Sequence, residues 1–334
     1  MKIIQTKPGA TDFRYFEALP KIIYPSNNIR HKQTEHINTT YLDSCYVLLM
    51  DDEPKARLCI YNNPELSYHG RVTACLGNYE CVDEPLASEK ILETAINKAK
   101  QSGFEFLIGP MNGSTWDQYR FSLHNDAPTF LLEPYHHVYY NHQFTQAGFE
   151  VIARYKSRID RSMNCNMPEI LKAEESFIAS GLHFRRINMA LFEHELDKLY
   201  PFISEAFRNN FLYTPIKRET FFAKYLEAAP LIHEQFFLIA EDDYGHIAGF
   251  IFSYPDLYNR DEPTLVIKTL AREASPKWKG LGYVLINKVM DAAKKSGYKS
   301  VIHAFMIDEG KSTANSNFFF GKNYKQYALY GIAL

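Results

Sequence analysis

The chain has 334 residues, which is long for one compact core and suits two domains, and with 46% hydrophobic and 23% charged residues its composition is that of a globular protein. The formal net charge is −2 and no run of Lys or Arg occurs, so a nucleic-acid partner is not expected. No apolar stretch approaches the roughly 20 residues that span a membrane, so no membrane association is expected. The five cysteines lack CxxC spacing, and we expect reduced, buried thiols in a cytoplasmic protein.

The N-terminal half combines strand patterns with one long helix. Apolar runs bounded by turn residues predict strands at residues 44–50, 55–61, 70–77, 104–108 and from 148 onwards. Apolar residues at spacings of three and four predict a helix over 86–101, which ends at Gly103.

The C-terminal half repeats this order of elements. Two amphipathic helices are expected over 190–211 and 218–229. The expected strands lie at 236–240, 247–254, 264–270, 299–306 and 324–332. A helix that ends at Gly297 follows the third of these strands, and a polar helical segment covers 312–320. The repeat is one of topology and not of sequence, so we predict an α/β (α+β) protein with tandem domains at 1–160 and 161–334.

The motif that indicates a function is the turn Lys277-Trp278-Lys279-Gly280-Leu281-Gly282-Tyr283, between a strand and a helix. A glycine turn at a helix start presents several backbone N–H groups at the positive end of the helix dipole, which favours phosphate binding. Gly280 and Gly282 remove Cβ atoms that would keep a pyrophosphate at a distance, and two lysines add positive charge. The nucleotide-binding spacing GxGxxG is absent, because Leu285 stands three residues after Gly282.

Residues 185–334 resemble a GCN5-related N-acetyltransferase (GNAT) domain in strand order and in this turn. Lys277, Gly280 and Gly282 stand at the positions of the family's [Gln/Arg]-x-x-Gly-x-[Gly/Ala] motif. The chain is similar to bacterial tandem-domain proteins with a degenerate N-terminal copy. The resemblance implies two GNAT-like domains, each a mixed, mostly antiparallel sheet flanked by helices. It also implies acetyl-coenzyme A or another acyl-coenzyme A as co-substrate, and no metal.

The family resemblance also implies which residues bind the cofactor. The fourth strand is expected to diverge from its neighbour, so that its main chain pairs with the pantetheine arm. The expected cofactor-binding residues are Thr269, Leu270, Ala271, Lys277, Lys279, Gly280, Leu281, Gly282, Tyr283, Ser312 and Ser316. Among the polar residues near 312–317, Ser312 aligns with a position at which the family often has Asn.

The corresponding segment of the N-terminal half, residues 80–89, has no glycine turn. Its four carboxylates would repel a pyrophosphate, and Pro85 lacks an N–H donor. We therefore expect this half not to bind coenzyme A but to shape a substrate cleft or serve a structural role.

Acyl transfer to an amine requires a deprotonated amine, an N–H that holds the carbonyl oxygen, and a proton for the leaving thiolate. The resemblance implies a Tyr as proton donor, and Tyr324, Tyr327 and Tyr330 are candidates. In a regular strand, Tyr324 and Tyr330 face one side and Tyr327 faces the other. His303, Glu273 and Asp308 are candidate bases, although His303 is also compatible with a core position.

The loop after residue 108 carries candidate substrate-binding residues, because loops beyond strand ends often form ligand sites. Asn112, Trp116 and Asp117 are the candidates, with a helix cap at Ser114 or Thr115 and a core Trp116 as the alternative. His137 and His142 lie near each other without a carboxylate, so we expect an aromatic surface loop there and no metal site.

The leading hypothesis is an N-acyltransferase that transfers an acyl group directly from acyl-coenzyme A to a small-molecule or peptide amine in a ternary complex. One alternative is a non-catalytic protein that binds coenzyme A or another small ligand. The other is an aminoacyl-tRNA-dependent transferase of the same fold. The sequence identifies neither the amine nor the oligomeric state.

Overall fold

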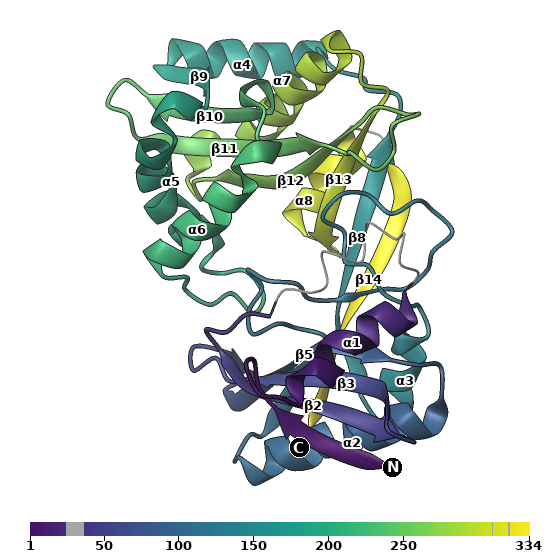
Figure 1. The fold of residues 1–334 in the computed structure, drawn as a ribbon. Coiled ribbons are helices and arrows are strands. Elements are labelled where there is room, and N and C mark those ends of the chain that lie inside the picture. The colour runs from purple at the N-terminus through teal and green to yellow at the C-terminus, as the bar shows by residue number, and fades with distance from the viewer. Residues whose placement is uncertain (25–36, 309, 320) are drawn as a thin grey trace. The chain divides into compact units, whose positions relative to one another are not determined.

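The computed structural model describes residues 1–24, 37–308, 310–319 and 321–334, with only the backbone described at 311–314 (Figure 1). The chain forms two compact units. Unit 1 comprises Met1–Arg154, Phe211–Thr214 and Gln326–Leu334, and unit 2 comprises Tyr155–Asn210 and Pro215–Lys325. The chain first passes from unit 1 to unit 2 after Arg154, six residues before the boundary expected at 160. Two later segments also belong to unit 1, because their residues pair and pack there, so the units are not consecutive in sequence.

Unit 1 is built on a sheet in which β1, β2, β3 and β5 are antiparallel neighbours, β6 is parallel to β5, and the second half of β14 is antiparallel to β6. Its elements are β1 (Lys2–Thr6), α1 (Phe13–Ile23), β2 (Leu42–Met50), β3 (Glu53–Tyr61), β4 (Ser67–Tyr68), β5 (Arg71–Cys81), α2 (Pro85–Gln101), β6 (Phe106–Gly109), β7 (Phe121–Ser122), α3 (Tyr140–Gln146) and the first residues of β8 (Glu150–Asp160).

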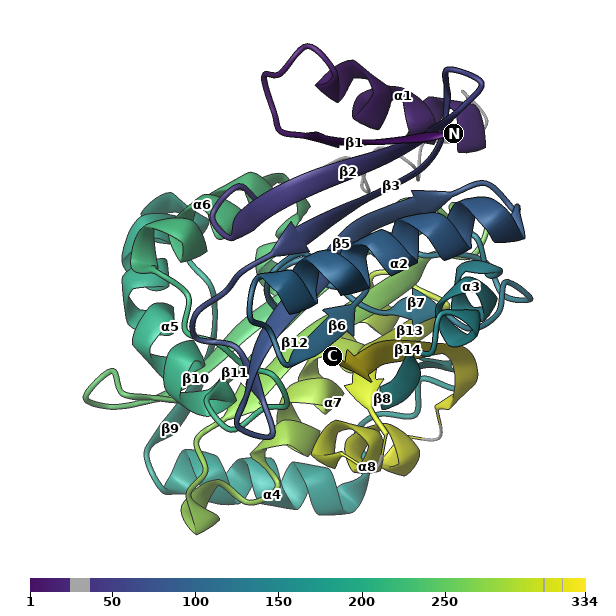
Figure 2. The same ribbon diagram turned by 90° about the horizontal axis from the view of Figure 1, so that it is seen from below.

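Helices α1 and α2 cover opposite faces of this sheet (Figure 2). Successive residues of β3 show why, since strand side chains alternate between faces. Leu58 packs in one cluster with Ile91 of α2. Arg57 donates to the Phe16 carbonyl of α1 at 2.8 Å. The sequence predicted an aromatic surface loop around residue 140. This prediction is wrong for Tyr140, whose side chain is fully buried in the apolar cluster that contains Ile91 of α2.

Unit 2 has the strand order β8, β13, β12, β11, β10, β9, in which only β12 and β13 are parallel. Its elements are α4 (Pro168–Ala179), β9 (Leu182–Arg186), α5 (Phe192–Phe207), α6 (Arg218–Ala228), β10 (Phe237–Asp242), β11 (Ile247–Pro255), β12 (Thr264–Arg272), α7 (Leu281–Lys295), β13 (Ser300–Ile307), α8 (Lys311–Phe318) and the start of β14 (Lys322–Ala333), with 3-10 turns at Met189–Leu191, Ala229–Leu231, Glu234–Phe236 and Pro276–Trp278. The predicted mixed, mostly antiparallel sheet is confirmed.

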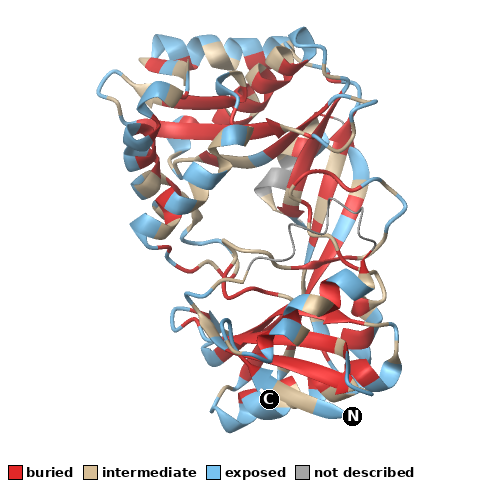
Figure 3. Cartoon of the chain, in the orientation of Figure 1, coloured by how far each residue is buried: buried red, intermediate tan, exposed pale blue. Residues whose placement is uncertain are grey.

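The sheet of unit 2 lies between α4 and α7 on one face and α5 and α6 on the other (Figure 1). Its strands are mostly buried, whereas the outer helix faces are exposed (Figure 3). The series β10-β11-β12-α7-β13 repeats the series β2-β3-β5-α2-β6 of unit 1. The predicted repeat of topology is therefore confirmed.

The five cysteines carry free thiols, as expected; Cys165 is half-buried and the other four are buried. In the part of the chain that the structure describes, no helix is both long enough and apolar enough to cross a membrane.

Candidate functional site

The turn before α7 presents three backbone N–H groups that lack a protein acceptor. Gly280 precedes the helix in the left-handed conformation, with φ of 95°, which explains the glycine there. Among the described residues, none accepts a hydrogen bond from the N–H groups of Gly280, Leu281 and Gly282. A Cβ at Gly280 would meet no atom within 4 Å, so this position faces open space. The turn therefore has the geometry of an anion site at a helix start.

Trp278 fixes the base of this turn. Its ring is buried in the same apolar cluster as Leu281 and Leu285 of α7. Its Nε1–H donates to Oε2 of Glu273 at 2.9 Å, and the ammonium of Lys277 lies 4.2 Å from its ring centroid. Lys277 thus stacks on the indole, and both Lys277 and Lys279 are exposed. Lys277, which stands at the Gln/Arg position of the family motif, therefore helps to hold the turn.

Strands β12 and β13 diverge on the way to the turn. Their parallel pairing runs from Thr264↔Ser300 to Ile267↔His303. Beyond this pair, β12 continues to Arg272 beside β11, with a bulge at Lys268. β13 changes register with β8 between His303 and Met306. The predicted divergence is confirmed, and it leaves the main chain of residues 269–271 without a β13 partner among the described residues.

Helix α8 brings an asparagine to the turn. A Cβ at Gly282 would lie 3.3 Å from Nδ2 of Asn315, so this amide packs directly against the glycine. Ser316 is fully buried beside it in sequence, and the side chain of Ser312 lies outside the described residues. The sequence showed Asn315 in the polar segment, but aligned Ser312 with the family's Asn position. Residues 312 and 315 are three apart in α8 and so lie on one side of the helix.

The three candidate tyrosines do not lie together. Tyr324 belongs to unit 2, like the turn, and Tyr327 and Tyr330 belong to unit 1. The hydroxyl of Tyr327 is buried and donates to Glu133 at 2.9 Å. That of Tyr330 donates to Asn141 at 2.8 Å, and burial raises the pKa of Tyr330. Of the three, only Tyr324 shares a unit with the turn.

The candidate bases of unit 2 lie in different surroundings. Glu273 accepts from Trp278, and Asp308 pairs with Lys156 at 3.0 Å. His303 is 4% exposed. Burial lowers the pKa of His303 to about 4, although the nearby Asp160 acts to raise it. Its imidazole is therefore neutral at neutral pH.

The equivalent fork of unit 1 is filled by its own chain. Pairing between β5 and β6 ends at Cys75↔Ile108. Beyond it, the Met111 N–H donates to the Leu76 carbonyl at 2.8 Å, and the Asn78 N–H donates to Oδ1 of Asn112 at 3.0 Å. A Cβ at Gly77 would meet Oδ1 of Asn112 within 3 Å. Residues 111 and 112 thus take the main-chain partners that a ligand would need.

The predicted substrate residues Asn112, Trp116 and Asp117 lie in one loop of unit 1 and bond to protein groups. Trp116 donates from Nε1 to the Thr214 carbonyl at 2.9 Å. Asp117 accepts from Asn38 at 2.8 Å and from Ser114 at 3.0 Å. In the described parts of the chain, no group of three His, Cys, Asp or Glu side chains is placed to hold a metal ion.

Comparisons with known proteins agree with this architecture. The sequence model of the acetyltransferase (GNAT) family matches residues 196–317. Across both units, the fold is similar to a tandem GNAT protein from the clavulanic acid biosynthesis pathway, with a TM-score of 0.58, 8% identity, and coverage of 99% of this chain and 98% of that one. The chain therefore has the fold of tandem GNAT proteins, and residues 196–317 match the model of the acetyltransferase (GNAT) family.

Two further solved structures share the fold. A GCN5-related N-acetyltransferase from Sphaerobacter thermophilus matches with a TM-score of 0.55 and 11% identity, over 99% of this chain and 95% of that one. The glucosamine N-acetyltransferase region of a fungal multi-domain β-N-acetylglucosaminidase matches with a TM-score of 0.60 and 11% identity. It aligns with 99% of this chain, which spans 38% of the fungal one. No curated protein matches the sequence.

Proposed function

We propose that the chain is an N-acyltransferase that uses acyl-coenzyme A, most simply acetyl-coenzyme A, and that its single cofactor site lies in unit 2. The observation that carries this proposal is the turn at residues 280–282, where three N–H groups have no protein acceptor among the described residues and Gly280 faces open space. Such a group of donors at a helix start suits a pyrophosphate. The fork beside it leaves strand main chain available for a pantetheine arm.

In the proposed reaction, the acceptor amine attacks the thioester carbon, so that an N–C bond forms and the C–S bond breaks. The amine loses a proton and the thiolate gains one. Among the three candidate tyrosines we assign the proton donor to Tyr324, because it belongs to the same unit as the turn. Main-chain groups of residues 269–271 would pair with the pantetheine arm.

The second candidate function is that of a non-catalytic binding protein. It is favoured because none of the three candidate bases is an unpaired group with an ordinary pKa. Glu273 is bonded to Trp278, Asp308 is paired with Lys156, and His303 has a lowered pKa. Turnover decides between the two functions. Binding of acetyl-coenzyme A, with release of free thiol in the presence of an amine panel, supports the enzyme. Binding without release supports the binding protein.

The cofactor site is tested by Gly282→Asp. The added carboxylate would stand among the N–H donors and repel a pyrophosphate, while the backbone at this position needs no left-handed conformation. We expect at least a hundredfold loss of affinity for coenzyme A, measured by isothermal titration calorimetry, with the melting temperature retained. Tyr244→Asp, at a residue that is 96% exposed in the hairpin turn between β10 and β11, is the control, because it adds a carboxylate away from the glycine turn without requiring a left-handed backbone. Unchanged affinity in Gly282→Asp would place the site elsewhere.

A further inference from the structure

The fork between β12 and β13 has a closed end, and His303 lies at it. The pair Ile267↔His303 is the last one before the strands part. Both strands become irregular immediately afterwards, β12 at the bulge of Lys268 and β13 at Phe305, which has a φ of 56°. A ligand that enters the fork from the turn therefore ends its path beside His303.

The imidazole of His303 is on the same face of the sheet as the turn. Residues paired across neighbouring strands point to the same face, so His303 shares the face of Ile267. Ile267 packs in the cluster of Leu281 and Leu285, the first turns of α7. The glycine turn and His303 thus lie at the two ends of the fork on one face of the sheet. Asn315 of α8 packs against Gly282 at the turn end.

The side chain of His303 is buried with an unused polar atom. Nε2 has less than 1 Å² of accessible surface and no hydrogen-bond partner among the described residues. Buried polar atoms in proteins nearly always have partners, so an exception calls for an explanation. Because the ring is neutral at neutral pH, a protonated Nε2 is a donor without a positive charge.

The cofactor arm is long enough to reach the closed end of the fork. A Cβ at Gly282 would lie 3.5 Å from Cδ2 of Leu270, and the three residues from Leu270 to Ile267 span roughly 10 Å in a strand. A pantetheine arm of about a dozen single bonds extends to roughly 15 Å. With its phosphate at residues 280–282, its thioester would reach the closed end of the fork.

We propose that Nε2–H of His303 donates a hydrogen bond to the acyl carbonyl oxygen of bound acyl-coenzyme A, so that the site distinguishes acyl-coenzyme A from free coenzyme A. This inference rests on the proposed cofactor site. Free coenzyme A has no carbonyl at that place and leaves Nε2 unpaired. Acyl-coenzyme A supplies an acceptor for Nε2–H. Free coenzyme A leaves this buried donor without a partner, which lowers its affinity relative to the acyl form.

The test compares His303→Leu, which removes the donor, with His303→Gln, which keeps one. Affinities for acetyl-coenzyme A and for coenzyme A are measured by calorimetry on the full chain, with thermal melts to verify folding. We expect His303→Leu to weaken acetyl-coenzyme A about tenfold and coenzyme A less than twofold, and His303→Gln to restore most of the difference. Ser253→Ala is the matched control, since Ser253 is also buried without a partner but lies on β11, outside the fork.

The outcomes separate the two proposals. Equal affinities of His303→Leu and the unaltered protein for both ligands, or an equal loss for both, overturn the role of His303 and leave the cofactor site standing. Failure of the unaltered protein to bind either ligand overturns both. If His303→Leu does not fold, His303→Gln and His303→Asn keep the comparison possible. A Ser253→Ala variant that changes the ratio as much as His303→Leu also contradicts the assignment.

Discussion

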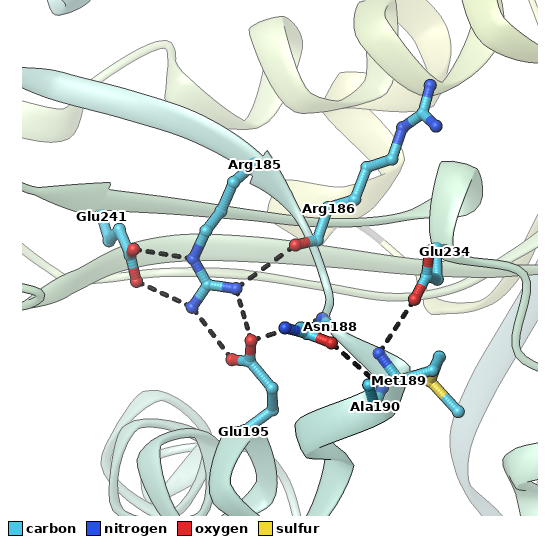
Figure 4. A network of polar contacts seen from close by, with 8 residues as sticks. All are labelled: Arg185, Arg186, Asn188, Met189, Ala190, Glu195, Glu234 and Glu241. Atoms are coloured by element: carbon cyan, nitrogen blue, oxygen red, sulfur yellow. Dashed lines mark hydrogen bonds and ion pairs between the residues drawn. The ribbon is translucent and has the colours of Figure 1, made fainter.

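At the scale of single side chains, Arg185 of β9 is the centre of an ion-pair network in unit 2 (Figure 4). Its guanidinium donates two hydrogen bonds to Glu241 of β10, at 2.6 and 2.9 Å, and two to Glu195 of α5, also at 2.6 and 2.9 Å. Glu195 also accepts from the Asn188 N–H at 3.3 Å. One residue thus fixes α5 to the edge of the sheet, and doubly bonded pairs of this kind are the stronger ones.

This network predicts a pH-dependent stability. The hydrogen bond from Arg185 lowers the pKa of Glu241. The stabilisation is therefore fully present above the ordinary pKa of Glu and is lost as the pH falls through the lowered value. We expect Glu241→Gln to cost about 1 kcal/mol in free energy of unfolding at neutral pH, because the pair is only partly buried. The difference should vanish in acid, as measured by urea unfolding across the pH range.

The control for this prediction is Glu227→Gln. Glu227 is an exposed residue of α6 without an ion-pair partner in the described structure. Its replacement should change stability little at any pH. A cost of Glu241→Gln that stays constant from neutral to acidic pH would show that shape, and not charge, determines the contribution of this side chain.

At the scale of elements, the two forks explain how two similar halves differ. In unit 2 the edge of β12 beyond Ile267 is left without a β13 partner, whereas in unit 1 residues 111 and 112 fill the corresponding place on β5. We expect one coenzyme A to bind per chain. Asn112→Ala removes the acceptor of the Asn78 N–H and should cost about 1–2 kcal/mol in unfolding free energy, without changing that stoichiometry.

Calorimetry and urea unfolding of Asn112→Ala test this. Asn38→Ala serves as the control, because Asn38 also bonds to the loop, at Asp117 and at the Asn112 carbonyl, but its removal leaves the bond between the Asn112 side chain and the Asn78 N–H in place. A second coenzyme A site in the unaltered protein would contradict a filled fork. Unchanged stability of Asn112→Ala would show that the Asn78 bond is not needed to keep the loop in place.

The elements themselves were largely predictable from local patterns. Alternation and turn residues predicted the hairpins β2–β3 and β10–β11, and apolar spacing predicted α2 and α7 up to Gly103 and Gly297, both with positive φ. The short elements β1, β4, β7, β9 and α3 were not predicted, because two to seven residues carry little periodicity. Helix α1, of 11 residues, was not predicted either, and it contains Pro20, a residue that usually interrupts helices.

The roles of side chains were harder to predict, because their partners are far away in the sequence. Strand parity separates Tyr327 from Tyr330, but it does not reveal Glu133 and Asn141, which lie 194 and 189 residues away. Likewise, nothing near Asn112 indicates that its amide oxygen accepts from a backbone N–H 34 residues earlier. Tertiary pairing decides such roles, whereas the glycine turn at the start of α7 could be located from the local sequence.

At the scale of the whole molecule, the chain passes between the two units four times, after residues 154, 210, 214 and 325. The short segment Phe211–Thr214 is held in unit 1 by bonds to Thr214, which receives Trp116 Nε1–H at its carbonyl and Asn63 Nδ2–H at its hydroxyl. Thr214 is fully buried. Trp116 therefore has a structural role, as in the alternative given for it from the sequence, but its partner Thr214 lies 98 residues away.

The last crossing predicts that unit 1 cannot fold from the N-terminal residues alone. Residues 326–334 supply the strand beside β6, through the pairs from Tyr330↔Gly109 to Ala333↔Phe106. They also supply the buried hydroxyl of Tyr327 to Glu133. A chain truncated after Lys325 would leave β6 with an unpaired edge and remove apolar contacts from the core of unit 1.

We expect this truncation to abolish hydrogen-exchange protection in β5 and β6 while α7 and β12 of unit 2 keep theirs. Exchange measured by mass spectrometry resolves the two units within one chain. Adding a peptide of residues 322–334 should restore protection in β6, because the missing strand can pair from solution. A control peptide with Tyr327→Asp should not, since a carboxylate there would face Glu133 in a buried site. Retained protection of β6 in the truncated chain would mean that β5 and the helices of unit 1 suffice to hold it.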